Sequence, residues 1–125
     1  METKNKKLGE LGEAIARNYL KKKGYSILES NFKRKWGEID IIGKKKGKII
    51  FFEVKCIFES PGFLPEDKIT LKKRKQLAKM AQVYLSENKF PFSVPCQIDI
   101  ITIELIPKKK KARIRHYKNA VEDIW

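Results

Sequence analysis

The sequence predicts an α/β protein in which a mixed central sheet of about four to five strands is flanked by two main helices. Two segments have helical periodicity, and the shorter apolar segments between and after them have the pattern of strands. Helix, strands, helix and strands in that order are typical of a sheet with helices packed on it. The 125 residues suit a single domain over 1–125, because two cores in so short a chain would each be marginal.

The first helix is expected over residues 8–23 and stops at Gly24. Its expected buried stripe consists of apolar side chains at helical spacing, namely Leu8, Leu11, Ile15 and Tyr19. A neighbouring ridge runs along Gly12, Ala16 and Leu20. Glu13 lies beside this ridge, where it either reaches inward at the margin of the packed face or remains an ordinary solvated glutamate. Residues 25–31 are predicted to form a short first strand.

The clearest pair of strands is predicted at residues 38–43 and 48–55, joined by the turn-prone sequence Lys-Lys-Lys-Gly. The second of these strands is apolar on both faces, as a buried central strand is. If Gly43 pairs with Lys48, Asp40 sits opposite Phe51. That register is an assumption, and a slip of one residue would turn Asp40 to the other face of the sheet.

The second helix is expected over residues 67–88, after a loop marked by Pro and Gly. Its apolar face consists of Leu77, Met80, Ala81, Tyr84 and Leu85. A fourth strand follows at 97–104, in which Asp99 is expected to have a structural role. After a basic turn at 107–111, a fifth strand or edge is expected at 113–117, with His116, the only histidine, at its surface.

Charge dominates the composition, because 29 Lys and Arg against 15 Asp and Glu give a net charge of +14. Such an excess raises the self-repulsion of the compact state and points to a polyanionic partner. We expect nucleic acid, DNA before RNA, with an anionic membrane surface second and a biased genomic composition as the neutral explanation. Without a membrane-spanning run or a signal-peptide pattern, the expected location is cytoplasmic, with Cys56 and Cys96 as thiols.

Two groups of basic side chains are candidate nucleic-acid contacts. On the second helix, four lysines fall on the side opposite the apolar face: Lys68, Lys72, Lys75 and Lys79. Lys73 lies close to these four lysines and is a further candidate contact. The other group is Lys33, Arg34 and Lys35. A solvated face explains these residues too, but no acidic residue lies between Lys68 and Ser86, which favours phosphate contact. For Trp36, which follows, a plug at the strand entrance is favoured over stacking on a base.

Charged side chains at the end of the buried strand suggest chemistry. Glu53 and Lys55 share one face, and the assumed register puts Asp40 on that face as well. Burying these charges is costly unless they pair or bind something. Two converging carboxylates attract a hard divalent cation such as Mg²⁺, and a neighbouring lysine can activate water or offset charge on a phosphodiester. A structural ion pair explains the same residues equally well.

The spacing of these residues resembles a known nuclease pattern. Asp40, twelve intervening residues and Glu53-Val54-Lys55 match the PD-(D/E)xK arrangement of restriction-endonuclease-like nucleases. With Glu13 on the helix, the set is also similar to archaeal Holliday-junction resolvases. Over nearly its whole length the chain resembles the small YraN-like family. The matching segments are 9–16, 20–25, 37–42, 51–55, 98–101 and 119–120, with Asn31, Lys73, Leu77, Ala81, Tyr84 and Leu85.

This resemblance implies a restriction-endonuclease-like fold with Mg²⁺ or Mn²⁺ as cofactor. By resemblance Asp40 and Glu53 are metal ligands, and Glu13 is an accessory acid and a third candidate ligand. Lys55 is then the catalytic lysine, with a contribution from Lys73. Where relatives usually carry an arginine just after this lysine, the chain reads Cys56-Ile57-Phe58-Glu59. A phosphate contact from that position is therefore in doubt.

The functional hypothesis is a metal-dependent nuclease that hydrolyses phosphodiester bonds in DNA, with branched or flapped DNA as candidate substrates. The alternative is a nucleic-acid-binding protein of the same fold without catalysis, in which the acids and the lysine form a buried ion-pair network. An adaptor that docks on a protein or a membrane surface is a third interpretation. A homodimer would suit a two-strand substrate, but the sequence names no interface.

Overall fold

The computed structural model describes residues 4–121, apart from the side chains of Asp67 and Lys68, and confirms the α/β class. The elements in chain order are α1 (Lys4–Lys22), β1 (Ser26–Arg34), β2 (Gly37–Lys45), β3 (Lys48–Phe58), η1 (Pro65–Lys68), α2 (Leu71–Glu87), β4 (Cys96–Ile106), η2 (Pro107–Lys109) and β5 (Lys111–Tyr117). The sheet has the order β1-β2-β3-β4-β5. It is mixed, because β3 and β4 run parallel and the other neighbours run antiparallel.

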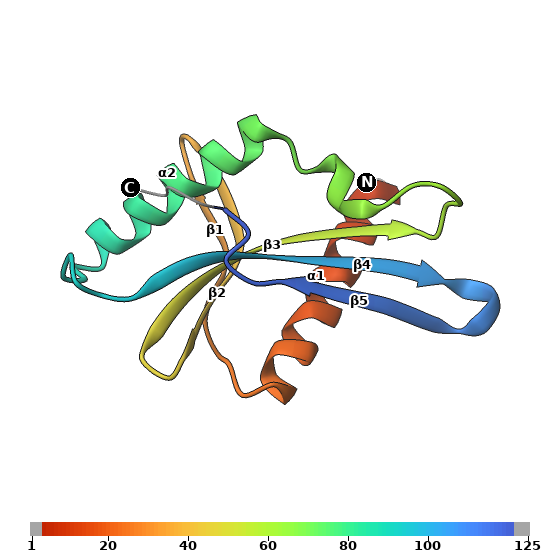
Figure 1. The fold of residues 1–125 in the computed structure, drawn as a ribbon, viewed down its shortest axis with the longest axis horizontal. Coiled ribbons are helices and arrows are strands. Elements are labelled where there is room, and N and C mark those ends of the chain that lie inside the picture. Colours follow the sequence, from red (N-terminus) through yellow and green to blue (C-terminus); the bar gives the residue numbers. More distant parts are fainter. Residues whose placement is uncertain (1–3, 122–125) are drawn as a thin grey trace.

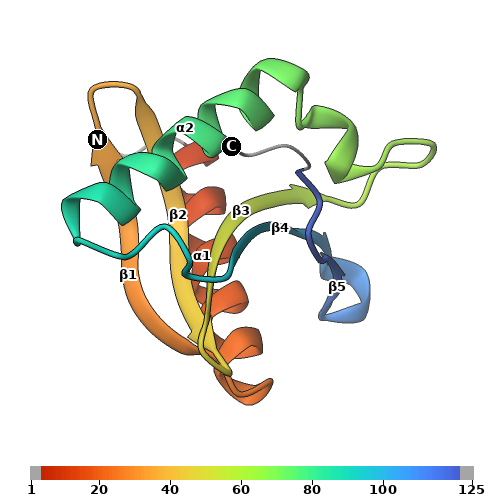
Figure 2. The same cartoon turned by 60° about the vertical axis from the view of Figure 1, so that its left-hand side comes forward.

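The two long helices cover opposite faces of the sheet (Figures 1 and 2). On one face, the predicted apolar side of α2 packs against Phe51 of β3 and Ile98 of β4. On the other face, α1 packs against Phe52 of β3 and Ile101 of β4. Consecutive residues of β3 thus belong to two different cores. This confirms β3 as the buried central strand.

The buried side of α1 differs from the predicted stripe. Its buried residues are Gly12, Ala16 and Leu20, whereas Leu11 is 48% exposed. The physical reason is a close approach between helix and strand, because a Cβ added to Gly12 would lie 2.5 Å from the Cβ of Cys56 on β3. A ridge of small residues permits that approach, and larger apolar side chains are displaced to its margins. The helix also begins at Lys4, earlier than expected.

The assumed strand register is wrong by two residues. Gly43 pairs with Ile50, and the last pair between β2 and β3 is Ile41 with Phe52. Because side chains alternate with a period of two, an even shift leaves the predicted face of Asp40 unchanged. Beyond this pair β2 and β3 separate, while β3 continues beside β4 as far as Phe58. We call the opening between the two strands the β2–β3 fork.

The expected long second helix is divided at Thr70. Residues 65–68 form the short turn η1, and α2 begins at Leu71. Thr70 has an extended backbone, and its hydroxyl accepts a hydrogen bond from the backbone N–H of Lys73 at 3.1 Å. A threonine in this arrangement is a helix N-cap, so the helix starts here rather than at residue 67.

His116 is not a surface residue, because its side chain is only 7% exposed. Its Nε2 lies 2.7 Å from an oxygen of Asp99, and its Nδ1 lies 3.0 Å from the hydroxyl of Tyr19. The pairing of β5 with β4 sets His116 opposite Ile101, on the face that α1 covers. Asp99 also accepts hydrogen bonds from Gln97 and from the backbone of Asn119. This environment is consistent with the structural role expected for Asp99.

Two further expectations concern the cysteines and the membrane. Cys56 and Cys96 are free and half-buried, as expected for thiols. In the part of the chain that the structure describes, neither helix has the length and apolar character needed to cross a membrane.

Two glycines of α1 give a matched test of its packing. A Cβ at Gly12 would lie 2.5 Å from Cys56, whereas a Cβ at Gly9 meets nothing within 4 Å. We expect Gly12→Ala to lower the free energy of unfolding by about 1–3 kcal/mol, because helix and strand must move apart. Gly9→Ala should raise it by about 0.5–1 kcal/mol through helix propensity. Urea denaturation measures both, and equal shifts would contradict the close packing.

Candidate active site

The site residues converge at the β2–β3 fork. One carboxylate oxygen of Asp40 accepts a hydrogen bond from the backbone N–H of Val54 at 2.8 Å. Val54 lies just beyond the last pair of the two strands, where a backbone carbonyl of β2 no longer faces it. Because a half-buried N–H needs an acceptor, the Asp40 carboxylate replaces the missing strand partner. The fold thereby holds Asp40 in a fixed position against β3.

Glu53 is beside Asp40 and is nearly buried, with 8% of its surface exposed. Burial, followed by the charge of Asp40 and a hydrogen bond to Asp40, raises the pKa of Glu53 from its ordinary 4.5 to about 9. Two carboxyl groups this close cannot both carry a full charge without a compensating cation. In the protein alone, the pair therefore holds a proton at neutral pH.

A lysine from α2 reaches this pair. The ammonium of Lys73 is 3.4 Å from a carboxylate oxygen of Glu53 and 3.4 Å from the side-chain oxygen of Gln76. Its charge acts to lower the pKa of Glu53, against the larger effects of burial and Asp40. The sequence placed Lys73 among candidate phosphate contacts. The structure brings it to the carboxylates, in the first turn of α2, which Thr70 caps.

Gln76 is a site residue that the sequence did not reveal. Its amide nitrogen donates a hydrogen bond to the backbone carbonyl of Trp36 at 2.7 Å, which ties α2 to the turn between β1 and β2. A Cβ on Gly37 would lie 2.6 Å from the Gln76 side chain, and the φ of Gly37 is +152°. Both facts require glycine there. The sequence indicated a role for Gln76 only through its position, one helical turn after Lys73.

Lys55 lies on β3 two residues after Glu53 and is half-buried. Among the described residues, no ion pair joins Lys55 to Asp40 or to Glu53; Lys73 forms that contact instead. The structural ion pair considered for Lys55 is therefore not formed. Lys55 lies in the part of β3 that no longer pairs with β2, at the open edge of the β2–β3 fork.

Glu13 approaches the pair from α1. Burial, followed by the charges of Asp40 and Glu38, raises the pKa of Glu13 from its ordinary 4.5 to about 7. Arg17 and a hydrogen bond from the side chain of Asn31 partly offset this rise. Asn31 has a φ of 55°, a left-handed conformation that asparagine tolerates within a strand better than most residues. The expectation that Glu13 reaches inward thus agrees with its environment.

The donor set can be compared with what a divalent cation requires. Across residues 4–121, leaving aside the undescribed side chains, no three His, Cys, Asp or Glu side chains gather closely enough to form a ready-made metal site. Mg²⁺, however, usually takes one or two carboxylates and keeps several waters. The crowded oxygens of Asp40 and Glu53 fit that requirement. Direct binding by Glu13 stays a prediction.

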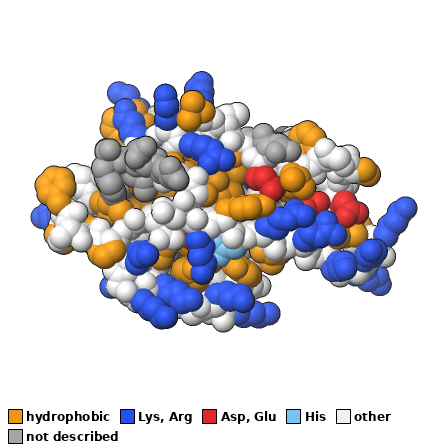
Figure 3. Space-filling model, in the orientation of Figure 1, with side chains coloured by type: hydrophobic (Ala, Val, Ile, Leu, Met, Phe, Trp, Pro, Cys, Tyr) orange, Lys and Arg blue, Asp and Glu red, His pale blue; other side chains and the backbone are white. Residues whose placement is uncertain are grey.

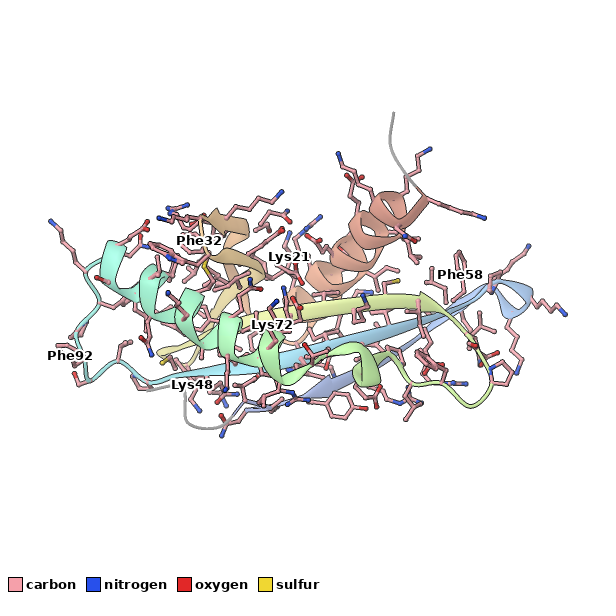
Figure 4. All side chains as sticks on the ribbon, turned by 90° about the horizontal axis from the view of Figure 1, so that it is seen from above. Lys21, Phe32, Lys48, Phe58, Lys72 and Phe92 are labelled. Carbon is pink, nitrogen blue, oxygen red and sulfur yellow. The ribbon has the colours of Figure 1, made fainter. Side chains whose placement is uncertain are left out.

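The basic candidates lie on the surface around the site. Lys72, Lys75 and Lys79 are exposed on α2, and Lys33, Arg34 and Lys35 are exposed around the end of β1. Lys and Arg dominate the charged side chains of the face seen in Figure 3, and Figure 4 shows Lys72 on α2. The side chain of Lys68 lies outside the described residues. Arg34 pairs with Glu87 at 2.6 Å and lies over the ring of Phe32.

The fold and site define a small α/β protein with a pair of buried carboxyl groups at a strand fork. The chain belongs to the uncharacterised protein family UPF0102, whose family model matches residues 12–103. It is 43% identical to a UPF0102 protein of Caldanaerobacter subterraneus subsp. tengcongensis, over 96% of this chain and 99% of that protein. It is 40% identical to a UPF0102 protein of Clostridioides difficile, over 93% and 97% of the two chains. The expected YraN-like membership is confirmed.

The carboxylate pair predicts a specific dependence of stability on pH. The pKa of Glu53 is raised to about 9 in the folded protein and is near 4.5 when unfolded. Between these values the folded state binds more protons, so stability falls as pH rises, by at most about 1.4 kcal/mol per pH unit. In Glu53→Gln, the free energy of unfolding should decrease less steeply with rising pH. In Glu10→Gln, a change on the exposed side of α1, the decrease should match that of the wild type. Urea denaturation in chelator between about pH 5 and 9 tests this; equal slopes for wild type and Glu53→Gln would contradict it.

Proposed function

We propose that the protein is a metal-dependent nuclease of the restriction-endonuclease-like, PD-(D/E)xK type, which hydrolyses phosphodiester bonds in DNA. The observation that carries this proposal is the convergence of Asp40 and Glu53 at the β2–β3 fork, next to a lysine on the same strand that neither carboxylate binds. A structural ion-pair network would use that lysine. A carboxyl group with a strongly raised pKa, such as Glu53, beside an uncommitted cation is typical of functional sites.

Asp40 and Glu53 are the residues that would hold Mg²⁺ or Mn²⁺. When bound, the metal would polarise the phosphoryl group and lower the pKa of a bound water. The protein supplies two carboxyl groups that repel one another, held in place by the backbone of Val54 and by Lys73. Such a pair favours a cation over the single proton that it otherwise shares.

The remaining site residues have roles that follow from their positions. Lys55, at the open edge of the fork, would orient the attacking water and offset charge on the phosphate. Lys73 would add a second positive charge from α2. Glu13 has a pKa of about 7, which suits proton transfer near neutral pH, and it faces the same pair from α1. The exposed lysines of α2 would contact flanking phosphates.

The first test is the variant Lys55→Ala. We expect it to lower cleavage by at least about 100-fold while leaving the fold intact, because it removes the charge that stabilises the transition state. Lys44→Ala, which changes an exposed lysine at the other end of β2, should retain activity. The assay is nicking of single-stranded, duplex, flap and junction DNA with Mg²⁺, with Mn²⁺ and with chelator. Wild-type rates in Lys55→Ala would overturn the assignment.

The same panel separates the alternatives. Salt-sensitive DNA binding without cleavage of any substrate would favour a nucleic-acid-binding protein without catalysis. The absence of DNA binding at moderate salt would favour an adaptor.

The second test measures the metal directly. Asp40→Asn keeps an oxygen that can accept from Val54 but removes a carboxylate, so we expect Mg²⁺ affinity to fall by at least about tenfold. Isothermal titration calorimetry of the folded variants measures this. Glu38→Gln, two residues along the same strand, is the control and should bind Mg²⁺ nearly as the wild type does. Equal affinity in wild type and Asp40→Asn would exclude Asp40 as a ligand.

A further inference from the structure

Trp36 occupies an unexpected place for a large aromatic side chain. It forms, with Lys35, the two-residue turn between β1 and β2. Turns of this kind favour small or polar residues, and nothing in the turn geometry calls for tryptophan. The residue is 43% exposed and belongs to neither hydrophobic core. The expected role as a buried plug is therefore not met, and the ring needs another explanation.

The position of Trp36 is fixed relative to the candidate active site. Its carbonyl accepts the hydrogen bond from Gln76 at 2.7 Å, and Gln76 contacts Lys73, which contacts Glu53. Along β2, Trp36 precedes Asp40 by four residues, about 13 Å in an extended strand. This is a distance that a few nucleotides cover. The ring is thus anchored close to the carboxylates.

Two ammonium groups lie next to the ring. The Nζ of Lys79 is 5.2 Å from the ring centroid, and the Nζ of Lys35 is 5.9 Å from it. Both ammonium groups lie over the ring, so a base that stacks on it takes the place of an ammonium, which stays close enough to meet the phosphate of that nucleotide. An aromatic face with adjacent positive charge matches a nucleotide, which carries a flat base and a phosphate one sugar away. The more exposed Phe92 has no such cations among its described contacts.

We propose that Trp36 is a stacking platform for an unpaired nucleobase, with Lys35 and Lys79 contacting its phosphates. A base inside a duplex is stacked on its neighbours and cannot offer its face to the ring. The substrate class is therefore DNA with a single-stranded segment beside the cleaved bond, such as a flap or a single-strand–duplex boundary. This inference rests on the proposed nuclease function for its link to cleavage, but the stacking is testable alone.

The test is binding in chelator, where cleavage does not interfere. The probes are a short oligothymidylate and a blunt duplex. We expect Trp36→Ala to weaken oligothymidylate binding by about 5- to 100-fold and to leave duplex binding unchanged. Trp36→Phe should retain most of the affinity, which separates stacking from a folding defect. Phe92→Ala, at the end of the molecule opposite Phe58 in Figure 4, should have no effect.

Two further measurements sharpen the result. Lys79→Ala should reduce the salt dependence of oligothymidylate binding by about 0.7 in slope, whereas Trp36→Ala should leave that slope unchanged. In a Trp125→Phe background, Trp36 is the only tryptophan, and oligothymidylate should quench its fluorescence. Unchanged affinity in Trp36→Ala, or equal losses on both probes, would overturn the platform. Because no cleavage is measured, inactivity of the protein as a nuclease would not affect this result.

Discussion

The separation of β2 from β3 after Ile41 and Phe52 is the constraint on which the rest of the site depends. It leaves the N–H of Val54 without a strand partner, and the Asp40 carboxylate fills that place. The same separation opens an edge of β3, on which α1 packs through Gly12. Strand pairing, helix packing and the position of the acids are therefore linked. The Asp40 side chain thus both completes the backbone hydrogen bonds of β3 and forms the pair with Glu53.

The site is held under electrostatic strain that packing alone does not explain. Burial and mutual repulsion raise the pKa of both Glu53 and Glu13, while the one cation bound to Glu53 among the described residues, Lys73, lies 3.4 Å away. Apolar side chains of similar volume would often be at least as stable in such a place. Proteins accept that cost at sites where charge is used, and the other buried acids here have close partners, as Asp99 has in His116.

Sequence pattern was sufficient for the elements and for the face of Asp40, because a period of two survives an error of two residues in register. It failed where close approach decides the packing. Gly12 contributes nothing to a hydrophobic stripe, yet it sets the distance from α1 to β3. Gln76 became visible only once α2 was placed over the fork, and His116 only once β5 was paired. Contacts between distant elements carry no local signal.

The departure from the family pattern after Lys55, in the segment Cys56-Ile57-Phe58-Glu59, falls at the end of β3, where side chains alternate between the two faces of the sheet. Cys56 faces Gly12 of α1, on the side of β3 opposite Lys55 and Glu53. An arginine in place of Cys56 would extend toward α1, whereas one in place of Ile57 would lie on the face of Lys55 and Glu53. Of the cations near the carboxyl pair, Lys55 lies on β3 and Lys73 comes from α2. If the site cleaves DNA, the strand therefore approaches across α2, the side on which Trp36 is anchored.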